Sequence, residues 1–154
     1  MTMGDDRYVY TVVIAAAAEK VWEGLTAPEF TRQYWHSTRV TSDWQPGSDI
    51  VFLVDGEDGD IIGCEGKILT VEYLQELSYT WSFPRNEATR DEPPSRVTFL
   101  LESIGEATRL TIVHDQFAEN SSMLSQVKDG WPLVICGLKT LLETGEPFDF
   151  SMRM

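Results

Sequence analysis

The fold of this chain is decided by residues 121–145, SSMLSQVKDGWPLVICGLKTLLETG. Apolar residues recur there at steps of three and four, which predicts one long amphipathic helix over roughly 121–143. Gly145 and Pro147 are typical of a helix end. The predicted apolar stripe consists of Leu124, Val127, Trp131, Val134, Leu138 and Leu141, widened by Ile135 and Leu142. A stripe of this length needs a large apolar surface to cover it.

The preceding residues predict that surface, because their sequence pattern is typical of antiparallel strands joined by polar turns. Tyr8 to Ile14 is β-branched and aromatic throughout, and it reads as a first strand. Period-two alternation is clearest in the later segments, where Leu77, Tyr79, Trp81 and Phe83 share one face. The further candidate strands are 39–43, 49–54, 61–73, 76–83, 95–103 and 107–114.

Two short helices are expected between the first strand and the others. One covers residues 18–25, and the second follows Thr26, which we expect to cap it, and ends near Trp35. The order is therefore a strand, two short helices, about six strands and a long helix. It predicts an α+β, helix-grip fold, in which a curved antiparallel β-sheet wraps around the long C-terminal helix.

The composition favours one soluble globular domain. The chain has 154 residues, of which 42% are apolar. We expect a disordered N-terminus over residues 1–7, one domain over 8–145 and a C-terminal tail over 146–154. The two cysteines lie far apart and no secretory signal opens the chain, which predicts reduced thiols and a cytoplasmic location.

The charge excludes some partners. Lys and Arg number 12 against 25 Asp and Glu, a net charge of −13. Affinity for a phosphate backbone comes from basic residues that displace counterions, so we expect no nucleic-acid partner. The same argument disfavours anionic membrane surfaces. No run of about 18 apolar residues occurs, so we expect no membrane insertion.

Several sequence blocks match one superfamily together. They are AAAAEKVWEGLTAPEF (15–30) with Tyr34-Trp35, DWQPG (43–47), LSYTW (77–81), PSRVTF (94–99), TRLTIVH (108–114), GWP (130–132) and LKTLLETG (138–145). These blocks resemble the START-like, or SRPBCC, superfamily. More closely they resemble its bacterial branch named after the C-terminal domain of the activator of Hsp90 ATPase. The likeness spans about residues 8–145.

The resemblance implies a deep pocket between the sheet and the long helix. Members of the superfamily bind lipids, hormones or polyketides, act in a few enzymes, or serve as co-chaperones in the stress response. Because they share a cavity and no common chemistry, the resemblance is more specific for the fold than for the function.

An aromatic set gives the candidate ligand-binding residues. They are Trp35, Trp44, Tyr79, Trp81, Phe83, Phe99, His114, Phe117, Trp131 and Ile135. On one interpretation they line an apolar pocket with a few polar groups. On the other they fill the core completely, as aromatic side chains commonly do.

The two histidines have open interpretations. His114 shares a face with Leu110 and Ile112, where it would be a proton donor or acceptor in a pocket wall, with a pKa near neutrality. The alternative is a structural histidine bonded to the backbone. His36 follows Trp35 in a predicted loop, where we expect exposure at the surface.

The sequence gives little support for a metal site or for a catalytic nucleophile. With two His and two Cys and no metal-ligand spacing among them, we expect no metal site and no cofactor, and we name no catalytic residue.

Gly130 and Gly137 fall on the long helix, where each glycine costs about 1 kcal/mol of helix stability relative to alanine. They indicate close helix–sheet packing or room for a ligand over the helix; we favour packing at Gly137 and a helix-entry turn at Gly130, helped by Pro132.

Three functional hypotheses follow. The first is binding of a small, mainly apolar molecule (lipid, aromatic or polyketide-like) in a cavity between sheet and helix. The second, carried by the family name, is a protein-interaction module that contacts a chaperone. The third is an enzyme of cyclase, dehydratase or hydrolase type, which needs His114 or an inward carboxylate as general acid or base. A homodimer is compatible with all three.

Overall fold

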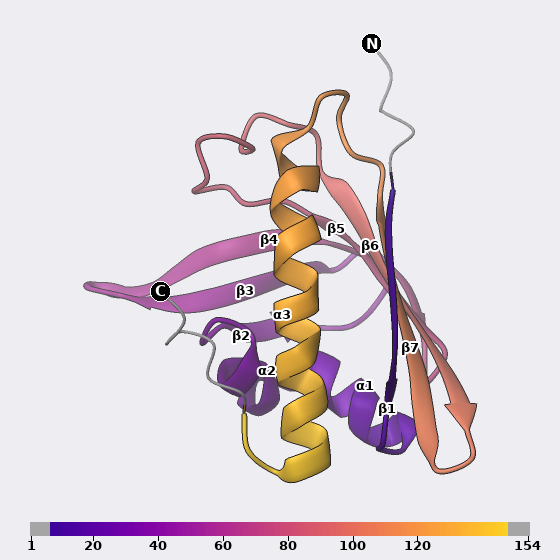
Figure 1. Ribbon diagram of the computed structural model, residues 1–154. Helices are drawn as coiled ribbons and strands as arrows, with labels where there is room; N and C mark the ends of the chain where they lie inside the picture. Colours follow the sequence, from indigo (N-terminus) through magenta and orange to yellow (C-terminus); the bar gives the residue numbers. More distant parts are fainter. Residues whose placement is uncertain (1–6, 148–154) are drawn as a thin grey trace.

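The computed structural model describes residues 7–147, and it has the predicted α+β helix-grip architecture. A seven-stranded antiparallel sheet curves around one long helix, and two short helices close one end of it (Figure 1). The elements are β1 (Tyr8–Ile14), α1 (Ala18–Thr26), α2 (Pro28–Tyr34), β2 (Arg39–Ser42), β3 (Asp49–Gly56), β4 (Gly59–Glu72), β5 (Glu76–Trp81), β6 (Ser95–Ile104), β7 (Ala107–Asp115) and α3 (Ser122–Thr144).

The sheet order, β1-β7-β6-β5-β4-β3-β2, places the first two strands at opposite edges. Helices α1 and α2 carry the chain from one edge to the other, while β2 to β7 follow one another as antiparallel neighbours (Figure 1). Strand β1 pairs with β7 over its full length, from Tyr8 opposite His114 to Ile14 opposite Thr108. We expected a disordered N-terminus over residues 1–7 and a C-terminal tail over 146–154. Both segments lie outside the described residues, except for Arg7, Glu146 and Pro147.

Two irregularities bend the sheet at β4. Its register against β3 shifts beside Phe52 and leaves Gly63 without an opposite residue; a second shift, against β5, follows Ile68. Between them the backbones of β4 and β5 approach closely at Gly66, where an added Cβ would collide with the Thr80 carbonyl oxygen. Bulges of this kind bend a strand and turn its side chains toward new directions. They open the sheet away from the helix at this end.

Helix α3 is capped at both ends. The Ser121 hydroxyl accepts hydrogen bonds from the backbone N–H groups of Met123 (2.9 Å) and Leu124 (3.4 Å). The Glu92 carboxylate accepts from the Ser122 N–H at 3.0 Å, which places a negative charge at the positive end of the helix dipole. Gly145 ends the helix in the left-handed conformation, as the sequence predicted.

Two local predictions were wrong. Thr26 does not cap α2, whose N-cap is Ala27; its hydroxyl instead donates to the Trp22 carbonyl at 2.9 Å, inside α1. Gly130 is not a helix-entry turn either, because α3 begins at Ser122 and continues through Gly130 and Pro132. A Ser121 cap with a carboxylate partner outweighs the weak helix propensity of these two residues.

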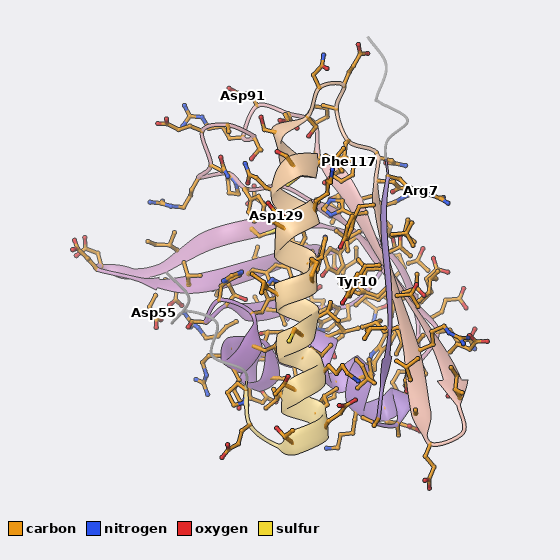
Figure 2. All side chains as sticks on the ribbon, in the orientation of Figure 1. Arg7, Tyr10, Asp55, Asp91, Phe117 and Asp129 are labelled. Carbon is orange, nitrogen blue, oxygen red and sulfur yellow. The ribbon has the colours of Figure 1, made fainter. Side chains whose placement is uncertain are left out.

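The side chains between α3 and the sheet form the core, while acidic side chains such as Asp55, Asp91 and Asp129 project outward (Figure 2). The end near α1 and α2 is closely packed. There the Tyr34 hydroxyl donates to the Gly24 carbonyl at 2.6 Å, and Gly137 packs against Tyr34. Gly137 is closely packed, as predicted, but its neighbour is Tyr34 of α2 and not the sheet.

Candidate functional site

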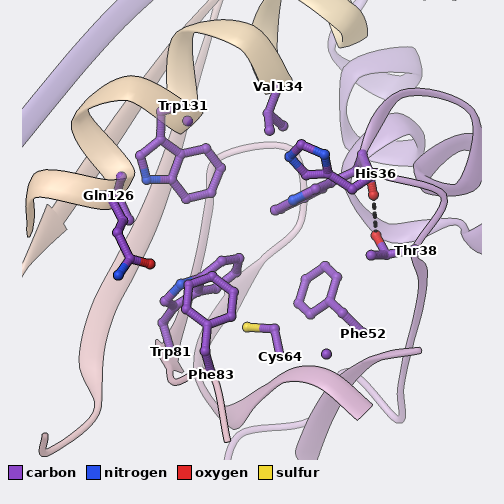
Figure 3. Close-up of a pocket in the computed structure, with 13 residues that line it drawn as sticks. His36, Thr38, Phe52, Cys64, Trp81, Phe83, Gln126, Trp131 and Val134 are labelled. Atoms are coloured by element: carbon purple, nitrogen blue, oxygen red, sulfur yellow. Dashed lines mark hydrogen bonds between the residues drawn. The ribbon is translucent and has the colours of Figure 1, made fainter. Parts of the chain in front are cut away.

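The other end of the core holds a cavity of about 300 Å³ between α3 and strands β3 to β5 (Figure 3). That volume equals the share of about ten water molecules in the liquid, and it lies at the lower end of the range for small-molecule sites. The lining residues are Trp35, His36, Thr38, Phe52, Gly63, Cys64, Trp81, Phe83, Gln126, Val127, Gly130, Trp131 and Val134.

Helix α3 forms one wall of the cavity. Its five lining residues, from Gln126 to Val134, recur at helical spacing and therefore share one face. Gly130 lies in the middle of that face, and a Cβ added there would meet nothing within 4 Å. The helix backbone itself is thus part of the wall, and no atoms of residues 7–147 fill the space beside it.

Aromatic rings form most of the remaining wall. The indoles of Trp35 and Trp81 stack with ring centroids 5.9 Å apart, and that of Trp131 lies 5.5 Å from each of them. Phe83 meets Trp81 edge to face at 5.5 Å. Because these rings support one another, they hold a rigid apolar surface on which a flat or aliphatic guest can pack.

The bulge in β4 supplies the opposite wall. Gly63 leaves bare backbone beside the cavity, and Cys64 points its sulfur into it (Figure 3). Burial raises the pKa of the Cys64 thiol well above its usual value, so this thiol stays protonated at neutral pH. A protonated, buried thiol acts as a small apolar group rather than as a nucleophile.

The turn after α2 contributes Trp35, His36 and Thr38. The Thr38 hydroxyl donates to the Trp35 carbonyl at 2.6 Å, drawn as a dashed line in Figure 3, and this bond holds the turn that carries Trp35. His36 is largely exposed, as expected, yet it also lines the cavity. Partial burial lowers the pKa of its imidazole, which favours the neutral form at pH 7.

One buried polar group of the wall has no partner among the described residues. Trp81 is 4% exposed, and its indole N–H is buried without a hydrogen-bond acceptor. A buried donor left unpaired costs about 1–3 kcal/mol. Such a group is rare in folded proteins, and it often marks a place that a water molecule or a ligand completes.

Four of the ten sequence-predicted site residues line the cavity, namely Trp35, Trp81, Phe83 and Trp131. The other six do not. Tyr79, Phe99 and Ile135 are at most 1% exposed and belong to the closed core. Trp44 is half-buried and lies after β2 in a left-handed turn, with φ of 57°. His114 and Phe117 lie behind Trp131.

His114 belongs to a chain of hydrogen bonds that fixes Trp131. The Trp131 indole N–H donates to His114 Nδ1 at 3.0 Å, so the imidazole proton must be on Nε2. That Nε2–H donates to the Ser95 hydroxyl at 2.7 Å, and Ser95 donates in turn to the Trp81 carbonyl at 3.3 Å. The Phe117 ring stacks on the imidazole at 4.6 Å. His114 is thus a positioning residue for a cavity wall.

The prediction of a near-neutral pKa for His114 was wrong. The residue is fully buried, and desolvation lowers the pKa of its imidazole to about 3, against a small opposing effect of the Asp115 charge. The alternative interpretation, a structural histidine, fits better, although its partners are side chains rather than backbone. His114 on β7 and Trp131 on α3 come from distant parts of the sequence, so no local pattern could reveal this pairing.

Sequence reasoning missed nine lining residues. The helical period from Trp131 could have found Val127 and Val134, which lie four and three positions away, and Gly130 lies four positions before Val134. Phe52, Gly63 and Cys64 depend on the β4 bulge, which has no reliable sequence signal. The remaining three are His36, Thr38 and Gln126.

Within residues 7–147, no three His, Cys, Asp or Glu side chains gather closely enough to hold a metal ion. Of the residues that line the cavity, none is Asp, Glu, Lys or Arg. No helix in the described part of the chain is long and apolar enough to cross a membrane. The cavity can therefore hold a ligand by complementary shape and apolar contacts, with hydrogen-bond donors at its edge. Among the described residues, it has no charged side chain in its wall to act on a ligand.

A curved antiparallel sheet that clasps a C-terminal helix over an apolar cavity defines a helix-grip protein of the START-like class. The chain belongs to the family described as activator of Hsp90 ATPase homolog 1-like protein, whose model matches residues 15–143. The family predicted from the sequence blocks is thereby confirmed. Comparison with curated proteins finds no match.

Solved structures share the fold along nearly the whole chain. CalU16 from Micromonospora echinospora has a TM-score of 0.72 at 22% identity, over 96% of this chain and 80% of its own. DynU16, from the dynemicin biosynthetic locus, has a TM-score of 0.71 at 27% identity, over 94% of this chain and 49% of its own. The Aha1 dimer from Colwellia psychrerythraea has a TM-score of 0.70 at 17% identity, over 91% and 98%.

Proposed function

We propose that this domain binds a small, mainly apolar molecule of lipid, aromatic or polyketide type in the cavity between α3 and the sheet. The observation that carries the proposal is the cavity of about 300 Å³, whose wall is mostly aromatic and whose helix side is bare backbone at Gly130. Apolar surface of this kind gains free energy when a guest displaces water from it.

The position of Gly130 supports a binding role over a packing defect. A glycine inside a helix costs about 1 kcal/mol relative to alanine, and Pro132 two positions later removes a backbone hydrogen bond. Within residues 7–147 no side-chain packing at Gly130 offsets this cost, whereas the cost at Gly137 is offset by its packing on Tyr34. Affinity for a ligand accounts for a glycine at a position where the fold gains nothing from it.

The relatives add modest support. DynU16 is described as a protein of the dynemicin biosynthetic locus, and at 27% identity it is similar to this chain over 94% of the chain's length. A locus for the synthesis of a natural product is a setting in which a pocket for a polyketide-like molecule is useful. We also propose that the chain has a small-molecule partner and that it acts in the cytoplasm.

The test uses a plugged cavity. A neutral aromatic probe, 2-naphthylacetamide, at 100 times its Kd should stabilise the wild-type chain by about 2.7 kcal/mol. For a chain of this size that raises Tm by roughly 5–10 °C. Gly130→Leu fills the space beside the helix and should abolish the shift. Ser125→Leu adds the same side chain at an exposed site of α3 outside the cavity and should keep it.

Quenching of tryptophan fluorescence gives an independent readout, because Trp35, Trp81 and Trp131 all line the cavity. A panel of fatty acids and aromatic ketones extends the search beyond one probe. If no member of the panel stabilises the wild-type chain, or if Gly130→Leu responds as the wild type does, the proposal is wrong.

A chaperone-associated role is the second candidate, and the description of the family is what favours it. On that hypothesis the chain acts through its surface, and addition of the chain should raise ATP turnover by an Hsp90. Gly130→Leu separates the two functions, since it closes the cavity and leaves the surface unchanged. Stimulation that survives the substitution would favour the interaction role.

A further inference from the structure

The cavity borders a groove that differs from it in character. Three residues, Gly63, Phe83 and Gln126, line both spaces, so the groove begins where the cavity ends. Beyond them the groove is lined by the segment after Phe83, from Arg85 to Ala88. An apolar compartment therefore continues into a polar one across the Phe83 and Gln126 side chains.

Each hydrogen bond at this junction engages an amide oxygen as its acceptor and leaves amide donors unpaired. Asn86 Oδ1 accepts from the Ala88 backbone N–H at 2.9 Å, so the Asn86 side-chain amide must present its NH₂ to Gln126. That NH₂ donates to Gln126 Oε1 at 2.9 Å. The Nε2 hydrogens of Gln126 have no acceptor among residues 7–147. Each amide oxygen thus already accepts one hydrogen bond, whereas the Gln126 NH₂ group donates none to the described residues.

Two further donors lie on either side of Phe83. On the cavity side, the Trp81 N–H is buried without a partner. On the groove side, Arg85 is exposed and forms no ion pair within the described part of the chain. Six other basic residues are paired with carboxylates: Lys20, Arg39, Lys67, Arg96, Arg109 and Lys139. Arg7, Arg32, Arg90 and Lys128 are likewise unpaired among residues 7–147, and of these five basic residues only Arg85 lines the groove.

We infer that the ligand is an amphiphile whose apolar body fills the cavity and whose carboxylate lies in the groove against Arg85. This inference rests on the proposed function, and it specifies the class of ligand. A carboxylate is an acceptor without donors, so it complements the free groups of Arg85 and Gln126. Glu87 is the acidic residue of the groove, and its charge should reduce the affinity for an anion.

The experiment compares two probes of equal shape, 2-naphthylacetate and 2-naphthylacetamide, by fluorescence titration at pH 7.5. The measured quantity is the ratio of their Kd values. Arg85→Gln should shift that ratio against the acetate by about two- to fivefold, the range for an exposed ion pair. Arg90→Gln is the matched control, because it removes the same charge from an exposed residue of the same loop that does not line the groove.

Glu87→Gln should shift the ratio in the opposite direction, toward the acetate, by a similar factor. High salt should shrink both effects, since exposed charges are screened. A ratio unchanged by Arg85→Gln, or changed equally by Arg90→Gln, overturns the inference while the amide still binds. If neither probe binds the wild-type chain, the proposed function itself fails.

Discussion

Gly130 and Gly137 lie seven residues, about two turns, apart on one face of helix α3, yet their surroundings differ. A Cβ on Gly137 would lie 3.1 Å from the Tyr34 Cβ and 3.3 Å from the Tyr34 carbonyl oxygen. A Cβ on Gly130 would meet nothing within 4 Å. The same helix therefore closes one end of the core, against α1 and α2, and leaves the other end open, against β3 to β5.

The difference comes from what faces the helix. At the closed end, Tyr34 from α2 and the α1 backbone fill the gap, and their polar groups bond to each other. At the open end, the β4 bulges carry the sheet away from α3, and rigid indoles held by hydrogen bonds line the space. A cavity persists there because its wall is fixed from behind and cannot collapse inward.

The largest expected effect comes from adding the same side chain at both glycines. Gly137→Leu should destabilise the chain by about 2–3 kcal/mol, because the new side chain collides with Tyr34 in a closed core. Gly130→Leu should cause no loss, since space is available and leucine favours helix. Urea unfolding of both variants measures the contrast. Equal destabilisation would show that the two ends of the core do not differ.

A second prediction concerns pH, and it examines how the open end is held. The pKa of His114 is about 3 in the folded chain against an ordinary 6.5, so between these values the unfolded chain binds a proton that the folded chain does not. The free energy of unfolding should therefore fall as pH drops below about 6.5, by up to about 1.4 kcal/mol per pH unit. His36, whose pKa is also lowered, contributes in the same direction.

Denaturant titrations at pH 7.5, 6.5 and 5.5 give this slope. His114→Gln removes the titrating group and should flatten the curve in that window, although it also lowers stability at pH 7.5 by disturbing the bonds to Trp131 and Ser95. A slope that stays the same in the variant would assign the pH dependence to other groups.

The smallest expected effect is a gain. Gly130→Ala should raise the free energy of unfolding by about 0.5–1 kcal/mol, because alanine is the better helix former and its methyl group meets no obstacle. Gly137→Ala should gain less or lose stability, as its methyl group presses on Tyr34. Thermal unfolding of the pair measures both. A gain at Gly137 as large as that at Gly130 would contradict the difference in packing.

The family and the architecture could be predicted from the sequence because both depend on local and repeated signals. The stripe from Leu124 to Leu141 requires a helix, and the alternation from Leu77 to Phe83 requires a strand with one buried face. Once these elements exist, an antiparallel sheet around a single long helix buries every apolar face. The sequence blocks that match the superfamily indicated the same fold.

The cavity could be predicted only in part. Trp35, Trp81, Phe83 and Trp131, four of the residues expected to bind a ligand, do line the space, since large aromatic residues on facing elements converge. Tyr79 and Phe99 carry the same residue types with the same periodicity, yet they are packed solid. Periodicity indicates which side of a strand faces inward, and it does not indicate how far away the opposite element lies.

The sequence by itself thus determined the elements, their order and the faces they bury, because hydrophobic periodicity and capping act over a few residues. The tertiary structure alone decided where the core is empty, that His114 is neutral and holds Trp131, and that Gly130 and Gly137 have opposite roles. These features depend on distances between segments far apart in the chain. Such distances are set by two bulges in one strand and by the packing of Tyr34 under the helix.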